Sequence, residues 1–406
     1  MNAMEMMKIL EETSYVRTSG TEEELRCAVY IQEKLRSLGC EARLEPFDVE
    51  MARITEAELT VDGVSYPCKG YFCAGSWDVE APLYYLRHDD AFSLSQCRGK
   101  IVLLDTFVGY WKYQDLLNAG AAGYITCNGN LYFPDRDIDQ KEQRSFVRKD
   151  SQMPAVNIHA ADAVEIVRNR GKMARIRLKQ DQWIGQSHNI ILDIPGQVEE
   201  YIAFTAHYDT THLSVGPFDN MSGCVGLMYL AEYFAKNPQR YSLRFIWCGS
   251  EERGLLGSKA YCEDEENLKN CVLNINLDMI GSLMGKFLTC VTADENVCQY
   301  IRALSAECGI QNDVYQGIYS SDSTPFADKG IPAVSFARNP VRSMFGYHDR
   351  YDTIAIMDGE QMQEDFEFVL AFAKRMASAK YFPFAREIPD TVRTKLDNYL
   401  GIKRMK

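Results

Sequence analysis

The chain has 406 residues, of which 46% are hydrophobic, 25% charged and 11% aromatic, so two or three ordinary globular domains are expected. Because 57 acidic residues outnumber 44 basic ones and give a net charge of -13, nucleic acid and anionic membranes are disfavoured as partners. We see no signal peptide and no apolar run near the roughly 18 residues of a membrane span. The 13 cysteines lack a repeated spacing, which is typical of reduced thiols, and we therefore expect a cytoplasmic protein.

A helix followed by a strand is predicted at the start of the chain. Thr21 to Glu24 matches a capping box, and apolar residues then recur at helical spacing up to Gly39. Residues 42–50 read as a strand. We assign residues 1–50 to the first part of an α/β domain.

A second, β-rich domain is predicted over residues 51–184. Short apolar runs separated by turn residues predict strands here, and residues 113–122 are helical in pattern. His88 and His159 are not clustered with carboxylates at ligand spacing, so we interpret both as surface or structural residues. The segment is therefore predicted to be an insertion without chemistry of its own.

Strands and helices alternate over residues 185–385, which predicts a largely parallel sheet between layers of helices. The helices are expected over residues 219–235, 255–261, 296–307 and 359–380. Residues 386–406 are predicted to form a last helix or a frayed terminus.

Histidines and carboxylates follow the apolar strands of this second α/β segment. His207 ends the run IAFTAH, and Asp209 lies two residues on, where its carboxylate could orient the imidazole. Asp219 lies in a loop before a helix. It could cap that helix, or its two oxygens could bridge two cations.

Three further groups complete the pattern. Glu251 and Glu252 follow the apolar run FIWCGS, where one carboxylate could bind a metal and the other take a proton from water. Asp278 ends the run LNINL and is either a turn cap or a ligand. With His348 of GYHD, the set of imidazoles and carboxylates suits zinc or a similar ion.

The order of these motifs resembles a known peptidase family. HYD, DN, EERG, LDMIG, SDSTPFADKGIPA and YHDRYDT follow one another as in the M28 di-zinc metallopeptidases, the aminopeptidase Y and glutamate carboxypeptidase group. The opening RTSGTEEELRCAVYIQEKLRSLGCEA is similar to that family's first helix. GKIVLLDT, LLNAGAAGYIT and MPAVNI are similar to its protease-associated (PA) domain.

The resemblance implies a fold and a domain arrangement. Residues 1–50 and 185–385 would form a three-layer αβα zinc-peptidase domain of the phosphorylase/hydrolase-like type, with a central mixed, mostly parallel sheet. Residues 51–184 would form an inserted β-rich PA-like domain.

The resemblance also implies a role for each candidate site residue. Two Zn²⁺ ions, replaceable by Co²⁺ or Mn²⁺, would be held by His207 and Asp278, by Glu252 and His348, and by a bridging Asp219. Glu251 would be the general base that serves a metal-bridged hydroxide, and Asp209 would support His207. Tyr347 would polarise the scissile carbonyl. The peptide bond between Asp219 and Asn220 is expected to be cis.

Three alternatives to an aminopeptidase activity stay open. We favour an aminopeptidase acting on peptides, but a carboxypeptidase of the glutamate carboxypeptidase type would use Arg338 and Arg342 to bind a carboxylate. The same fold could also serve as a binding protein without hydrolysis, or catalyse glutaminyl cyclisation. The oligomeric state is open, with a homodimer as one alternative.

Overall fold

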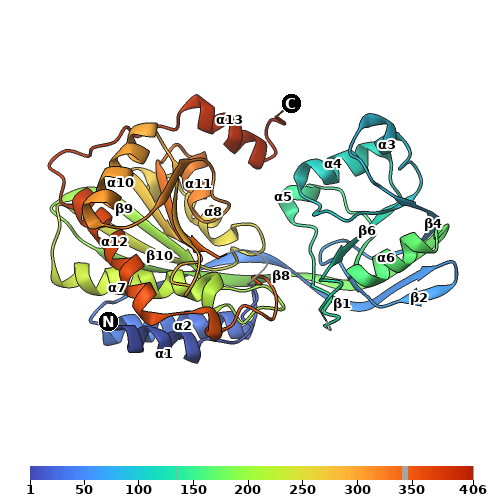
Figure 1. Cartoon of the computed structure of the whole chain (residues 1–406), viewed down its shortest axis with the longest axis horizontal. Coiled ribbons are helices and arrows are strands. Elements are labelled where there is room, and N and C mark those ends of the chain that lie inside the picture. The colour runs from blue at the N-terminus through green and yellow to red at the C-terminus, as the bar shows by residue number, and fades with distance from the viewer. Residues whose placement is uncertain (134, 341–345, 406) are drawn as a thin grey trace. The chain divides into compact units, whose positions relative to one another are not determined.

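The structure, a computed structural model, describes residues 1–133, 135–340 and 346–405. The chain divides into two compact units, which we call the larger unit (Met1–Val49 with Gln186–Lys406) and the smaller unit (Glu50–Gly185). Figure 1 shows the helices and strands of each. Across these described ranges, no helix has the length and apolar character needed to cross a membrane.

A mixed, mostly parallel sheet forms the centre of the larger unit. Its strands are β9 (Val198–His207), β10 (Tyr241–Cys248), β11 (Cys271–Leu277), β12 (Lys286–Thr292), β13 (Asp313–Gln316), β14 (Ala333–Asn339) and the end of β8 (Met173–Ile194). They lie in the order β13-β12-β14-β11-β9-β10-β8. Neighbours from β10 through β9 and β11 to β14 are parallel, whereas β12 against β14 and β8 against β10 are antiparallel. The predicted sheet type is confirmed.

Helices cover both faces of this sheet. One face packs against α1 (Ala3–Glu12), α2 (Glu22–Ser37), α7 (Ser222–Lys236), α10 (Glu295–Cys308) and α12 (Gly359–Ala377). The other packs against α8 (Leu256–Glu263), α9 (Glu265–Leu268) and α11 (Ser323–Asp328). The remaining elements are η1 (Pro217–Met221), η2 (Ile354–Ile356) and α13 (Asp390–Tyr399).

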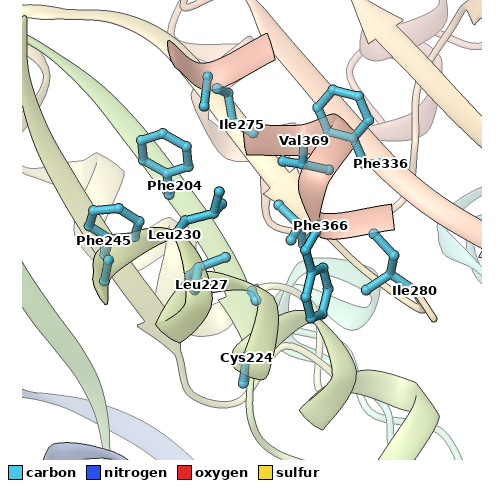
Figure 2. Close-up of a cluster of buried hydrophobic side chains, with 14 of the residues drawn as sticks. Phe204, Cys224, Leu227, Leu230, Phe245, Ile275, Ile280, Phe336, Phe366 and Val369 are labelled. Carbon is cyan, nitrogen blue, oxygen red and sulfur yellow. The ribbon is translucent and has the colours of Figure 1, made fainter. Parts of the chain in front are cut away.

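The buried side chains of the central strands alternate between these two layers. Phe204 and Phe245, from neighbouring strands, stack at 4.6 Å between ring centroids in the first layer, where Leu227 of α7 and Phe366 of α12 join them (Figure 2). Ala203, next to Phe204, faces the second layer instead. Because both faces are buried, these strands read as nearly continuous apolar runs, which is typical of parallel sheets.

The smaller unit contains a further set of paired strands. Its strands are β2 (Val64–Tyr66), β3 (Cys68–Gly70), β4 (Trp77–Tyr85), β5 (Ile101–Leu103), β6 (Gly123–Asn128), β7 (Ala155–His159) and parts of β1 (Arg43–Val61) and β8. Strands β4 to β7 are parallel neighbours in sequence order. Its helices are α3 (Ala91–Ser95), α4 (Tyr110–Ala119), α5 (Ser145–Arg148) and α6 (Ala160–Arg168).

Three features differ from the sequence-based expectations. β1 and β8 are single strands of 19 and 22 residues, where the pattern indicated several short ones. Helix α1 was not predicted, although Asn2 and Glu5 form a capping box at its start. The helix expected from residue 219 begins only at Ser222, because Asp219 and Asn220 have non-helical backbone angles.

Candidate metal centre

Four parallel strands bring the predicted ligands together. β9 ends at His207, Glu251 and Glu252 follow β10, and Asp278 follows β11 directly. His348 lies beyond β14. Since neighbouring parallel strands end at the same edge of a sheet, all these side chains reach one site at its carboxyl edge, the usual location of ligand sites in such sheets.

Asp219 is the shared member of two groups of candidate ligands. Its Oδ1 lies 3.1 Å from His207 Nε2, and its Oδ2 lies 2.9 Å from His348 Nε2. Asp278 Oδ1 is 3.7 Å from His207 Nε2, and Glu252 Oε1 is 3.1 Å from His348 Nε2. Within each group, the ligand atoms lie within 4.8 Å of one another. This is the pairing that the resemblance implied.

Glu251 stands beside the first group. Its Oε2 is 4.0 Å from His207 Nε2, and its side chain is 11% exposed. The Asp209 carboxylate accepts hydrogen bonds from the backbone N–H groups of Glu251 and Glu252 at 2.9 and 3.2 Å. Its Oδ1 also lies 3.4 Å from His207 Nδ1. Asp209 therefore links the histidine at the end of β9 to the glutamates after β10.

A buried hydrogen-bond network holds the Asp219 loop. The Asp219–Asn220 peptide bond is cis, as expected. Asn220 donates to Leu277 O at 2.9 Å and accepts from Met279 N at 3.1 Å, which ties the loop to the end of β11. Asp352 accepts hydrogen bonds from the backbone N–H groups of Phe218 and Asp219.

Backbone angles at the site are unusual for residues with side chains. Ser250, Met279 and His348 have φ values of 58°, 61° and 64°. The first two lie next to Glu251 and Asp278. Non-glycine residues in this left-handed region are uncommon and cluster at functional sites.

The charges at this edge fit a cation. Burial alone would lower the pKa of His207, but Glu251 and then the other carboxylates raise it well above 6.5. Burial, reinforced by Glu252 and Asp322, raises the pKa of Glu251 well above 4.5. Asp278 Oδ1 is buried without a hydrogen-bond partner among the described residues. Crowded carboxylates of this kind, with a buried oxygen left unpaired, are what a metal ion would stabilise.

Two tyrosines lie at the site. The ring of Tyr347 packs edge-on against the His348 imidazole, with 4.9 Å between centroids. The hydroxyl of Tyr319, which sequence reasoning did not single out, donates to the backbone oxygen of Asp278 at 3.3 Å.

The arginines predicted to bind a substrate carboxylate are a different case. Arg338 donates to both Asp365 oxygens at 2.8 and 2.6 Å and to Gly285 O at 3.0 Å. Its guanidinium is therefore engaged within the protein, which favours a structural role. Arg342 lies outside the described residues.

Sequence reasoning also missed several buried polar residues around the site. Arg17 is fully buried and donates to the backbone oxygens of Tyr208, Val215 and Gly216, in the segment between His207 and Asp219. Asp322 accepts a hydrogen bond from Ser258, and burial raises its pKa to about 7. The sequence feature that could have indicated Arg17 and Asp322 was their position in the motifs RTSG and SDSTPF.

Comparison with known proteins agrees with this geometry. The sequence is 26% identical to aminopeptidase YwaD of Bacillus subtilis over 381 residues, covering 89% of this chain and 81% of that protein. The fold matches an aminopeptidase from Aneurinibacillus sp. strain AM-1 with a TM-score of 0.76 and 23% identity, over 95% and 96% of the two chains. It also matches BSAP, a zinc aminopeptidase from B. subtilis, with a TM-score of 0.75 and 24% identity, over 96% and 98%.

The family comparison locates the relationship on the chain. Residues 189–373 match peptidase family M28. This range contains His207, Asp219, Glu252, Asp278 and His348, all the members of the two candidate ligand groups. The larger unit of this chain thus carries a peptidase family M28 domain.

Proposed function

We propose that the protein is a zinc-dependent aminopeptidase whose two zinc ions occupy the two ligand groups that share Asp219. The observation that carries the proposal is the placement of the Asp219 oxygens, 3.1 and 2.9 Å from the two histidines. A carboxylate that offers one oxygen to each of two imidazole-containing groups is suited to bridge two cations. The names of the relatives, aminopeptidase and zinc aminopeptidase, support the same assignment.

The donor set suits zinc, because each group offers one imidazole nitrogen and carboxylate oxygens. His207 and Asp278 would hold one ion, Glu252 and His348 the other, and Asp219 both. When bound, such ions supply Lewis acidity and lower the pKa of water to about 7.

Glu251 is the residue we assign to proton transfer. Its carboxylate is nearly buried and lies beside the first ligand group, while Glu252, the next residue, faces the second. Glu251 would take a proton from the attacking water and return it to the leaving amine. Asp209 fixes the backbone from which both glutamates project, so it acts as a positioning residue. Tyr347 would donate a hydrogen bond to the carbonyl oxygen as charge develops there.

The engagement of Arg338 favours an aminopeptidase over a carboxypeptidase. A carboxypeptidase needs a cation free to bind the substrate carboxylate, and the Arg338 guanidinium already pairs with Asp365.

We also propose that the smaller unit is PA-like. Its segments GKIVLLDT, LLNAGAAGYIT and MPAVNI, on which the resemblance rests, overlap β5, β6 and β7. These strands are adjacent and parallel.

Metal analysis and peptide cleavage together test the proposed function. Zinc per chain would be measured by mass spectrometry, and hydrolysis would be followed on a tripeptide with free ends, its N-acetylated form and its C-terminal amide. We expect about two zinc ions, cleavage of the free peptide and of the amide, no cleavage of the N-acetylated form, and loss of activity on chelation.

Other outcomes select the alternatives. Cleavage that requires a free C-terminus would support a carboxypeptidase. Absence of hydrolysis with two zinc ions bound would contradict an enzyme and support a binding protein on this fold.

A further inference from the structure

A buried carboxylate outside the M28-matched range contacts the loop that carries Glu251. Glu24 lies in the first turn of α2, is 2% exposed, and comes before the matched residues 189–373 in the sequence. Its Oε1 accepts hydrogen bonds from Ser250 N at 3.1 Å and Ser250 Oγ at 3.2 Å. Ser187 Oγ donates to the same oxygen at 2.8 Å, and Gly20 N donates to Oε2 at 2.6 Å. One carboxylate therefore joins three segments that are distant in sequence.

The loop it contacts is closely packed and conformationally unusual. Ser250 is fully buried with φ of 58°, and its hydroxyl also lies 2.6 Å from Ser19 Oγ. A Cβ at Gly249 would lie 2.5 Å from Ser187 Oγ and 3.1 Å from Glu24 Oε1, so a larger residue cannot occupy that position without displacement. The left-handed conformation of Ser250 needs such surrounding contacts to persist.

The same loop continues into the Asp209 contacts. The N–H of Ser250 donates to Glu24, and the next two N–H groups, of Glu251 and Glu252, donate to Asp209. Three consecutive backbone donors are therefore fixed by two buried carboxylates. The direction in which the Glu251 side chain leaves the backbone depends on both.

We propose that Glu24 is a positioning residue that holds the Gly249–Glu252 loop so that the Glu251 carboxylate stays beside the first ligand group. This inference rests on the proposed function, because it assigns Glu24 a role in a reaction that Glu251 serves. A capping box would instead direct the Glu24 side chain to the N–H of Thr21. Here Thr21 Oγ1 does accept from Glu24 N, but the Glu24 carboxylate accepts from Gly20, Ser187 and Ser250.

The test compares Glu24→Ala and Glu24→Gln with Thr21→Ala in the full-length zinc-loaded protein. Thr21→Ala is a matched control, because it removes the cap of the same helix and leaves the Glu24 carboxylate contacts in place. The turnover number and KM would be measured on the tripeptide with free ends, together with zinc content and the unfolding temperature.

We expect Glu24→Ala to lower kcat about 10²-fold, because a displacement on the order of 1 Å at a reacting group has that effect. KM should change less than about threefold and zinc should stay at two per chain, since no proposed ligand is removed. Glu24→Gln keeps one oxygen for Ser250 but loses the second acceptor, which Gly20 N requires, so it should lower kcat by about tenfold, less than Glu24→Ala does. Thr21→Ala should leave kcat within about twofold while lowering the unfolding temperature.

Several results would overturn the proposal. One is a kcat within about threefold of wild type for Glu24→Ala. Others are loss of zinc in that variant, or an equal loss of kcat in Thr21→Ala. If Glu24→Ala does not fold, Glu24→Gln decides: kcat equal to wild type together with intact folding contradicts the role.

A double substitution separates positioning from general stabilisation. In the Glu251→Asp variant, Glu24→Gln should lower kcat by a smaller factor than it does in the wild type, because both substitutions change the position of the same carboxylate. If the double variant loses kcat by the product of the two single factors, Glu24 and Glu251 have independent roles. If the wild-type protein does not cleave the peptide, the proposed function and this inference fail together, whereas activity unaffected by Glu24 variants removes this inference alone.

Discussion

Three carboxylates at the candidate metal centre and two in the smaller unit have pKa values shifted in opposite directions. At the edge of the larger unit's sheet, burial raises the pKa values of Glu251, Glu252 and Asp322. In the smaller unit, backbone N–H groups lower the pKa values of Asp62 and Asp90. The first group is crowded and lacks enough donors, while the second caps turns and helix ends. The difference indicates where a cation is required.

The polar side chains near the strand ends also differ between the two units. In the smaller unit, Thr126, Asn128 and Asn157 pair with one another at 2.7 to 2.9 Å, so uncharged groups satisfy one another there. Among the described residues, both groups able to hold a metal ion lie in the larger unit. A parallel sheet therefore supplies the edge, and the side chains at the strand ends determine whether it binds metal.

The largest expected effect follows substitution of the shared carboxylate. Asp219→Asn keeps the shape of the side chain but leaves one oxygen where two are needed, so zinc should fall from two ions per chain to one or fewer. Activity should fall at least about 10³-fold, because the charge stabilisation in the transition state is lost. Mass spectrometry of the dialysed protein and the tripeptide assay would measure both.

Asp139→Asn in the smaller unit is the matched control. Asp139 is also a buried aspartate, and its Oδ1 has no hydrogen-bond partner among the described residues. The variant should keep two zinc ions and full activity. Two zinc ions retained by Asp219→Asn would show that this residue does not bridge.

Substitution of the proposed base should separate chemistry from metal binding. Glu251→Gln removes the proton acceptor and retains the side-chain volume, so kcat should fall by about 10³-fold with two zinc ions still bound. Steady-state kinetics and metal content would be measured on the same preparation. Glu263→Gln, at the end of α8, is a control in the same unit and should behave as wild type. Equal activity of Glu251→Gln and wild type would make the assignment wrong.

The two tyrosines predict a smaller and graded effect. If Tyr347 donates to the carbonyl oxygen, Tyr347→Phe should lower kcat by about 10²-fold, the typical loss for one such donor. Tyr319→Phe should cost no more than about tenfold, because its hydroxyl is bonded to a backbone oxygen in the protein. If Tyr319→Phe lowers kcat more than Tyr347→Phe does, Tyr319 would be the residue that donates to the carbonyl oxygen.

The ligand groups were predictable because each candidate follows an apolar strand. His207 and Asp278 come directly after buried runs, and the edge of a parallel sheet then brings them together. Residue type and order indicated the candidate ligands, since zinc binds only a few kinds of side chain, whereas their division into two groups came from the resemblance to the M28 peptidases. The alternative for Asp219 as a helix cap was wrong in the structure, because the helix begins at Ser222 and Asp219 has extended backbone angles.

The support around the ligands was not predictable from local patterns. Glu24 matches a capping box in sequence, but its contacts with Ser187 and Ser250 span 163 and 226 residues. Arg17 likewise bonds to backbone oxygens 191 to 199 residues away. No local periodicity encodes such contacts, because they depend on how distant loops meet. The two long strands were missed for a related reason, since pairing along their whole length overrides local breaks in the pattern.

The smallest effect should appear at a turn of the smaller unit. Asp62, with φ of 48°, joins β1 to β2, and its carboxylate accepts hydrogen bonds from Met173 N at 2.9 Å and Lys172 N at 3.0 Å. These donors, Met173 first, hold its pKa below 3.8. Because the pKa is lower in the folded protein, the group stabilises the fold above about pH 4 and this contribution is lost as the pH falls through the folded value.

Asp62→Asn should therefore lower the unfolding temperature slightly at pH 6 and reduce the difference from wild type as the pH approaches 3. Asparagine tolerates the positive φ, so backbone strain should not obscure the change. Tryptophan fluorescence suits the measurement, because three of the 4 tryptophans, Trp77, Trp111 and Trp183, lie in the smaller unit. A constant difference across this pH range would mean that the charge of Asp62 does not stabilise the turn. The smaller unit's carboxylates would then differ from those at the metal centre in exposure alone.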